Sequence, residues 1–431
     1  MNPTTNPFAP GAGTQPPELA GRDAIIAMAT ITLARVKLGR PARSAILLGL
    51  RGVGKTVLLN RIAALAEGEG FEPVLLEAPE DRRLAELLVP PLRQLLFRLS
   101  RRSARAGELV RRGLGVLRSF AKAFKVKVGG VEFTVEPELG AADSGYLESD
   151  LTEVLVAVAV AAKEAGTAIA LIVDEVQYLS GADLAALIVS LHKVTQRGLP
   201  FVFFGAGLPQ VAGLAGDAKS YAERLFDYPE VGPLSDSAAR EAVAAPVRRE
   251  GAEITEEALV EVVTRTKGYP YFLQEWGFHA WNSSSSSPIS GEDARAASGR
   301  ALEALDRGFF RVRLDRLTPR ERDYVRAMAE LGPGPHRSGE IAGLLRLKVS
   351  AAAPLRDKLI KKGMVYSPQH GDTAFTVPMF DEFMRRTMPG WAPAGPAESV
   401  PERVQRVRNT RERVTSPKSA ADLVRARRGK P

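Results

Sequence analysis

Apolar runs alternate with helical patterns along the first half of the chain. The runs occupy residues 44–48, 71–76, 169–173 and 201–204. Each is short and mostly apolar, which predicts a strand, and the nearly continuous run at 44–48 predicts a fully buried one. Between the runs, apolar residues recur at helical spacing, as Leu58, Ile62 and Leu65 do after the first run. Strands that alternate with helices predict an α/β fold whose parallel sheet has helices on both faces.

The second half of the chain shows two further patterns of apolar and polar residues. Residues 236–309 are mainly helical by pattern, and the serine run at 283–287 predicts a flexible connector. Thr318-Pro319-Arg320-Glu321 is a capping box, so a helix begins there and ends at Gly332. Further helices are expected from Ser338 and from Ser350 to Gly363, followed by a hairpin over 364–377. Three helices and a hairpin predict a winged helix-turn-helix.

Composition narrows the classes of protein. The chain has 431 residues and no cysteine, which excludes disulfides, thiolate chemistry and cysteine zinc sites. Its start has no secretory pattern, and its longest apolar run is too short to cross a bilayer. We therefore expect a cytoplasmic protein. An excess of arginine over lysine (44 against 15) hints at a GC-rich bacterial source.

The net charge of +9 is unevenly distributed. Residues 82–127 hold 13 Lys/Arg against 2 Asp/Glu, residues 311–390 hold 15 against 9, and residues 391–431 hold 10 against 4. The remainder of the chain is therefore acidic. Clustered basic charge attracts phosphate polymers, although each cluster could equally be a solvated face.

A glycine-rich loop follows the first predicted strand. It reads Gly49, Leu50, Arg51, Gly52, Val53, Gly54, Lys55 and Thr56. In a Gly-x-x-x-x-Gly-Lys-Thr loop the glycines let backbone N–H groups surround phosphate oxygens, and the next helix points its positive end at them. Lys55 would reach the β- and γ-phosphates and Thr56 would ligate Mg²⁺. Since a buried strand precedes the loop and an amphipathic helix follows, we favour ATP and Mg²⁺ over a chance turn.

An acidic pair completes this chemistry. Asp174 and Glu175 end the apolar run at 169–173. Such a strand end places Asp174 beside Mg²⁺ and Glu175 where it can orient or deprotonate the attacking water. The alternative is that Glu175 merely ends a strand.

Residues 19–390 resemble an AAA+ or STAND ATPase of the origin-recognition-like group. The resemblance rests on the acidic pair, on the upstream Gly21-Arg22-Asp23 box and on the helical region that follows the predicted sheet. The resemblance implies that Gly21, Arg22 and Asp23 lie against the nucleotide base. It also implies that Gly268-Tyr269-Pro270 matches a Gly-x-Pro element near adenine, which makes Tyr269 and Pro270 cofactor-binding candidates.

Two further features of the family are matched less closely. Such proteins usually end the strand after the acidic pair with a polar sensor, but here Phe203-Phe204-Gly205-Ala206-Gly207 offers none before Gln210. Hydrolysis is then slow, or Gln210 substitutes. Arg224 resembles an arginine finger that meets the γ-phosphate of a neighbouring subunit, and the alternative is a surface arginine paired with Glu223 or Asp227.

The predicted third helix of the winged region suits DNA contact. Leu355 and Leu359 point inward by spacing, and an outward face carries the lysines Lys358, Lys361 and Lys362. Only Arg356 and the small Ser350 and Ala351 could read bases, so no sequence specificity follows. Winged helices also bind proteins. Phe380, Phe383 and Met384 are expected in the core.

The basic insertion also has an apolar face. Its leucines include Leu84, Leu87, Leu88, Leu92, Leu95 and Leu96. Their spacing predicts a helix that packs on the ATPase body, with arginines outside that either contact nucleic acid or are solvated.

These expectations define the domains and a function. The predicted segments are a disordered N-terminus (1–18), a P-loop ATPase core (19–235) with a basic insertion (about 82–127), a helical lid (236–310), a winged helix (311–390) and a basic disordered tail (391–431). The leading hypothesis is an ATP-hydrolysing switch that couples nucleotide state to DNA or another macromolecule. The alternative is a nucleotide-stabilised STAND-type regulatory or scaffold protein with little turnover and a protein partner. Self-assembly is plausible if Arg224 is a finger, and no membrane partner is expected.

Overall fold

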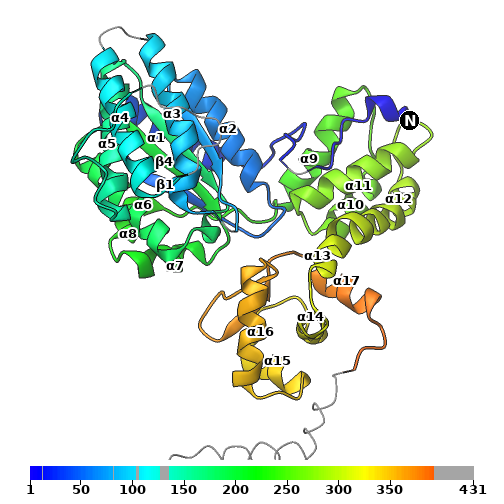
Figure 1. Cartoon of the computed structure of the whole chain (residues 1–431). Coiled ribbons are helices and arrows are strands. Elements are labelled where there is room, and N and C mark those ends of the chain that lie inside the picture. Colours follow the sequence, from blue (N-terminus) through cyan, green and yellow to red (C-terminus); the bar gives the residue numbers. More distant parts are fainter. Residues whose placement is uncertain (12, 81, 103–105, 127–134, 393–431) are drawn as a thin grey trace, which may run out of the picture.

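A computed structural model describes residues 1–11, 13–80, 82–102, 106–126 and 135–392. The chain forms an α/β region, a helical region and a small C-terminal region (Figure 1). Around Gly129-Gly130 the sequence pattern predicts a hairpin over 125–135. This segment and the tail from residue 393 fall largely outside the described residues. In the part of the chain that the structure describes, no helix is long and apolar enough to cross a membrane.

Five parallel strands form the central sheet, in the order β2-β3-β4-β1-β5. The strands are β1 (Ser44–Leu48), β2 (Glu72–Glu77), β3 (Ile169–Asp174), β4 (Phe201–Gly207) and β5 (Phe226–Asp227). Every residue of β1, β3 and β4 is buried, as continuous apolar runs require. The predicted α/β fold with a parallel sheet is confirmed. Only β5 was missed, because two residues give no pattern.

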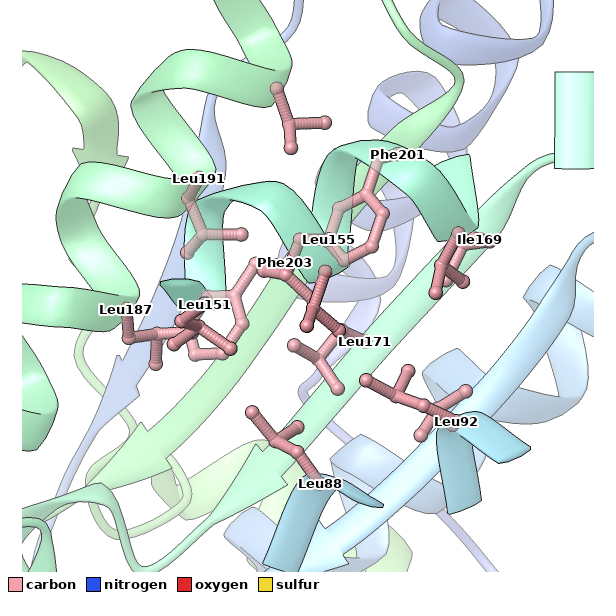
Figure 2. Close-up of a cluster of buried hydrophobic side chains, with 14 of the residues drawn as sticks. Leu88, Leu92, Leu151, Leu155, Ile169, Leu171, Leu187, Leu191, Phe201 and Phe203 are labelled. Atoms are coloured by element: carbon pink, nitrogen blue, oxygen red, sulfur yellow. The ribbon is translucent and has the colours of Figure 1, made fainter. Parts of the chain in front are cut away.

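Helices cover both faces of this sheet. They are α1 (Asp23–Lys37), α2 (Lys55–Gly68), α3 (Leu84–Arg102), α4 (Gly107–Ala123), α5 (Leu147–Glu164), α6 (Gly181–Gln196), α7 (Val211–Ala218) and the short α8 (Ala222–Leu225). Successive β1 residues point to opposite faces, so Leu47 joins the core under α1 and α2 while Ile46 joins the other core. Figure 2 shows that second core, where Leu88 and Leu92 of α3 approach Leu171 of β3.

The basic insertion forms α3 and α4 and packs on the α/β region as predicted. Of the leucines expected inside, only Leu87 is partly exposed. Several of its arginines are already paired, and two of them, Arg98 and Arg102, contact the Glu72 carboxylate of β2 at 2.8 and 3.1 Å. Part of the basic charge is therefore neutralised within the chain.

The helical region packs around tryptophans. It comprises α9 (Asp236–Arg249), α10 (Glu256–Thr266), α11 (Pro270–Ser283), α12 (Gly291–Ala304), the π-helical η4 (Leu305–Phe310) and α13 (Arg311–Asp315). Trp276 and Trp281 are both 2% exposed. The serine run is not the flexible connector that its composition predicts. Ser284 is buried and donates to the Ser286 carbonyl, and Ser287 Oγ accepts from the Glu253 amide, so side-chain hydrogen bonds fix a turn.

The predicted disorder of residues 1–18 is wrong for the residues described there. This N-terminal arm, which contains the short 3₁₀ helix η1 (Pro3–Thr5), lies along the helical region (Figure 1). Phe8 is 2% exposed, and a Cβ on Gly277 would lie 2.6 Å from its ring. Asn6 Nδ2 donates to the Phe278 carbonyl at 3.0 Å, and Trp281 Nε1 donates to the Asn2 carbonyl at 2.8 Å. A single aromatic ring in a glycine-sized recess thus orders a polar segment.

The C-terminal region contains the expected three helices and hairpin. Its elements are α14 (Pro319–Leu331), β6 (His336–Arg337), α15 (Ser338–Leu344), α16 (Val349–Lys361), β7 (Val365–Tyr366), β8 (Asp372–Phe375) and α17 (Phe380–Thr387). The strands form an antiparallel sheet in the order β6-β8-β7, of which β6 was not predicted. The Thr318 capping box is present, and Phe380, Phe383 and Met384 are buried as expected.

Two basic side chains that were expected to face outward turn inward instead. They belong to Arg356 of α16 and to Lys362, which caps the helix. Lys362 Nζ donates to Glu321 Oε2 at 2.7 Å and to the Arg316 carbonyl at 2.8 Å. Arg356 Nη1 donates to Ser338 Oγ at 3.2 Å. Both side chains turn back into the region because a buried carboxylate and a half-buried hydroxyl are within reach. Lys358 and Lys361 are exposed.

The packing of Phe8 predicts a stability effect. Phe8→Ala should lower the free energy of unfolding of the helical region by about 3 kcal/mol, because the truncation leaves a cavity beside Gly277. Urea unfolding followed by tryptophan fluorescence measures this, since Trp276 and Trp281 lie in the same core. Leu38→Ala is the matched control, because Leu38 is 70% exposed. Equal midpoints for the two variants would refute the packing.

Candidate functional site

The loop between β1 and α2 has a backbone that favours glycine. Gly52 and Gly54 have φ values of 82° and 91°, in the left-handed region that residues with a Cβ rarely adopt. Gly54 caps α2, whose first residue is Lys55. The first N–H groups of a helix have no intrahelical acceptor and carry its positive dipole end, so this loop presents donors suited to an anion.

Lys55 is buried over this loop. It is 7% exposed, and its Nζ donates to the carbonyls of Gly49 and Leu50, both at 2.9 Å. Burial lowers the pKa of Lys55, while the nearby carboxylates of Glu175 and Asp174 raise it. The ammonium therefore lies among carbonyl and carboxylate oxygens.

Thr56 and Asp174, 118 residues apart in sequence, meet at this site. Thr56 Oγ1 donates to Asp174 Oδ2 at 2.6 Å, and the Glu175 amide donates to Asp174 Oδ1 at 2.8 Å. Burial raises the pKa of Asp174, and these hydrogen bonds lower it. A hydroxyl and a carboxylate are hard oxygen donors of the kind that Mg²⁺ takes. Among the residues described, no cluster of three His, Cys, Asp or Glu could hold a metal.

Glu175 is held by a residue that the sequence did not reveal. Its φ is 55°, which is unusual for a residue with a side chain. Glu175 Oε2 accepts from Gln177 Nε2, and Gln177 Oε1 accepts from the Leu208 amide at 3.1 Å, just past the end of β4. Gly207 leaves room for this link, because a Cβ there would lie 2.8 Å from Gln177 Oε1.

Gln177 thus lies where a polar sensor at the end of β4 was expected. Gln210 lies at the N-cap of α7, forms no side-chain hydrogen bond with the residues described and does not line the cavity at this site. The suggestion that Gln210 substitutes for the sensor has no support in this geometry.

A cavity of about 420 Å³ opens between the α/β and helical regions. One wall is formed by residues 51–57 and Glu175, and the opposite wall by α11. The Tyr271 amide donates to the Gly52 carbonyl at 3.2 Å, which ties the start of α11 to the loop. The N-terminal arm lines the cavity too, with Ala9, Gly11, Gly13, Thr14 and Pro16.

Of the Gly21-Arg22-Asp23 box, Arg22 lines the cavity. Arg22 is 8% exposed and its Nη2 donates to the carbonyls of Val53 at 3.1 Å and Gly232 at 2.6 Å. Burial lowers the pKa of Arg22. Gly21 packs on Ala238, and Asp23 is exposed in the first turn of α1 and does not line the cavity.

The Gly-Tyr-Pro element lies at the start of α11. Gly268 has a φ of 70° and its carbonyl accepts from the Leu234 amide at 2.8 Å. Pro270 lines the cavity, whereas Tyr269 packs beside it.

Two arginines at the phosphate end connect to the C-terminal region. Arg51 Nη2 donates to Tyr178 Oη at 2.6 Å, and Arg51 Nη1 lies 3.9 Å from Glu175 Oε1. The Arg51 amide donates to the Thr376 carbonyl at 3.0 Å. Arg313 of α13 lines the cavity with its guanidinium 3.9 Å from the Phe309 ring centre. Burial, with Arg51 nearby, lowers the pKa of Arg313 to about 10. No motif marks Arg313, so sequence reasoning had no signal for it.

Arg224 is exposed on α8 and does not line the cavity. Within the described residues it forms no ion pair with Glu223 or Asp227, and Asp227 pairs instead with Arg43 at 3.1 Å. The finger role needs a second subunit and stays a prediction.

Comparisons with known proteins agree with this geometry. A family model for an AAA ATPase domain matches residues 18–204, and one described as a domain of unknown function (DUF8462) matches residues 307–384. No curated protein matches the chain. Among solved structures, the Walker-type ATPase PABY2304 of Pyrococcus abyssi is 19% identical, with a TM-score of 0.55, over 85% of this chain and 96% of that one.

Two further solved structures are less similar. The Aeropyrum pernix ORC1 protein in complex with DNA is 14% identical, with a TM-score of 0.45, over 88% of this chain and 94% of that one. The Thermotoga maritima RuvB Holliday junction branch migration motor is 14% identical, with a TM-score of 0.42, over 88% and 99%. The family match identifies residues 18–204 as similar to an AAA ATPase domain, and the first structure shares the fold.

The Gln177 link predicts a measurable loss. Gln177→Leu removes the acceptor of the buried Leu208 amide and should lower the free energy of unfolding by about 1–3 kcal/mol. Gln210→Leu, the matched control, should change it by less than about 0.5 kcal/mol. Chemical denaturation measures both. A larger loss in Gln210→Leu would contradict this assignment.

Proposed function

We propose that the chain is an ATP-dependent switch whose C-terminal region responds directly to the nucleotide. ATP binds in the cavity between the α/β and helical regions, and its hydrolysis changes the contacts of the C-terminal region. The observation that carries this proposal is the hydrogen bond from the phosphate-loop Arg51 amide to the Thr376 carbonyl.

The residues of the loop divide the chemistry between them. Lys55 leaves the Gly49 and Leu50 carbonyls to contact the β- and γ-phosphates. Thr56 and Asp174 are the residues that would hold Mg²⁺, which supplies charge neutralisation to the phosphates when bound. Glu175 orients and deprotonates the attacking water, while Gln177 fixes its carboxylate. At the other end of the cavity, Arg22 and Pro270 form part of the base-binding wall, as the family resemblance implies for the Gly21-Arg22-Asp23 and Gly268-Tyr269-Pro270 elements.

The phosphate end is mechanically linked to the C-terminal region. A triphosphate in the cavity attracts both Arg51 and Arg313, which now rest against Tyr178 and Phe309. Arg313 leads into α14, and Arg316 beside it lies 3.3 Å from Glu80 at the edge of the α/β region. The contact of Arg51 with Tyr178 packs against the C-terminal region, because a Cβ on Gly363 would lie 2.7 Å from both Arg51 Nη2 and Tyr178 Oη. Movement of the Arg51 guanidinium toward phosphate therefore removes a contact of the C-terminal region.

We assign the C-terminal region as a winged helix that binds DNA phosphates. Lys358 and Lys361 on α16 are the exposed lysines that support this role, since Lys362 and Arg356 are engaged within the region. The second candidate is a regulatory or scaffold protein with little turnover and a protein partner. The contacts of Glu175 with Gln177 and Arg51 favour it, because they occupy the carboxylate that must reach water.

Two variants test the chemistry. Lys55→Ala should abolish ATP binding in titration calorimetry. Glu175→Gln should keep ATP affinity but reduce phosphate release by about 10²–10⁴-fold, because the general base is lost. Glu223→Gln, which changes an exposed carboxylate, is the control. ATP binding that survives Lys55→Ala sinks the proposal, and full turnover in Glu175→Gln removes that residue from its role.

A charge-reversal pair tests the DNA assignment. Replacing both Lys358 and Lys361 with Glu should weaken duplex binding and reduce the slope of log K against log salt by about 2, because two phosphate contacts are lost. Replacing Lys163 and Lys193 on the α/β region is the control with the same change in charge. Steady-state turnover with and without duplex separates the two candidates. Stimulation by DNA supports the switch, and negligible turnover in both conditions supports the scaffold.

A further inference from the structure

One polar side chain in the cavity wall has no partner. Gln274 of α11 is 9% exposed and lines the cavity. Its Oε1 is buried without a hydrogen bond, and the amide forms none with any residue that the structure describes. A buried polar group left unpaired lowers the stability of a protein by about 1–3 kcal/mol. We therefore look for a hydrogen-bond partner in a bound ligand.

Gln274 lies on α11 beyond the residue that contacts the phosphate loop. Tyr271, at the start of α11, is tied to Gly52, and Gln274 lies nearly one turn further along the helix. The apolar residues of the cavity wall include Leu19, Leu234, Ala242 and Leu273. Apolar walls around one donor and acceptor pair are suited to a flat heteroaromatic ring.

Two charged side chains of the cavity wall are already engaged. Arg22 donates to the Val53 and Gly232 carbonyls, and Glu18 pairs with Arg249. Gln274 is therefore free to form hydrogen bonds with a bound base, while Arg22 and Glu18 stabilise the cavity wall.

We propose that Gln274 selects adenine in the ATP site, an inference that rests on the proposed function. Its Nε2 donates to N7 of the base and its Oε1 accepts from the N6 amino group, the pairing that a glutamine makes with adenine. The terminal amide torsion is broad, so the oxygen turns toward the cavity without leaving a rotamer well. Guanine presents two acceptors, O6 and N7, at the same edge, and one of them would face the amide oxygen.

Nucleotide titrations of the full chain test the proposal. The probes are ATP, GTP and purine riboside 5′-triphosphate, which lacks the N6 amino group. The wild-type chain should bind ATP roughly tenfold to a hundredfold more tightly than either of the others. Gln274→Leu should bind all three with affinities within about threefold of one another. Gln94→Leu, at an exposed position of α3, is the matched control and should keep the wild-type preference.

The same variant has a readout that does not need nucleotide. Because Gln274→Leu removes an unpaired amide, its nucleotide-free form should unfold at the same or a higher temperature than the wild type. Gln274→Met serves as the second variant and should lose the adenine preference in the same way.

The outcomes separate this inference from the proposed function. A preference for ATP that persists in Gln274→Leu or Gln274→Met overturns the assignment of Gln274. Equal wild-type affinities for the three nucleotides overturn adenine selection but leave the ATPase proposal standing. A wild-type chain that binds none of them, like Lys55→Ala, removes the proposed function itself.

Discussion

The buried ammonium of Lys55 constrains much of the architecture around it. A charge taken out of water is costly unless oxygens surround it, and here those oxygens come from the loop carbonyls and from Asp174 and Glu175. β1 and β3 lie on either side of β4 and run parallel, so their carboxyl ends reach the same edge of the sheet. An antiparallel arrangement would carry the acidic pair to the opposite edge. The parallel sheet is therefore a condition for burying this cation.

The same edge collects more positive than negative groups. Arg51 and Arg313 join Lys55 in lining the cavity, and Glu175 is the carboxylate closest to Arg51, at 3.9 Å. The pKa of Arg313, lowered to about 10, still leaves it charged at neutral pH, so the three cations repel one another. A triphosphate relieves that repulsion, and because Arg313 belongs to α13 the relief acts on the connection to the C-terminal region. Electrostatics at one end of a cavity can in this way bias the position of a whole region.

The parts of the site that could be predicted from the sequence are those formed by consecutive residues. The phosphate loop and the Asp174-Glu175 pair each combine an apolar run with a fixed local spacing, and the structure brings Thr56 and Asp174 together. Gln177 could not be found this way, because its significance depends on the Leu208 amide, which is 31 residues away. Phe8 gave no signal, since one aromatic in a polar segment has no periodicity and its recess lies at Gly277. Helical spacing placed Lys362 on an outward face and could not reveal the buried Glu321 carboxylate, which is 41 residues away.

Helix α11 connects these separate findings. Its first turn is hydrogen-bonded to the phosphate loop through Tyr271, its next turn carries Gln274 into the cavity, and Gly277 after that receives the ring of Phe8. A rigid helix cannot move at one of these points and stay fixed at the others. A shift of α11 on nucleotide binding must therefore either move the N-terminal arm with it or expose the Phe8 ring to water. Since a buried phenylalanine contributes about 1.5–3 kcal/mol, the arm is expected to follow the helix. The arm, the proposed base-binding wall and the phosphate loop are therefore expected to move as one unit.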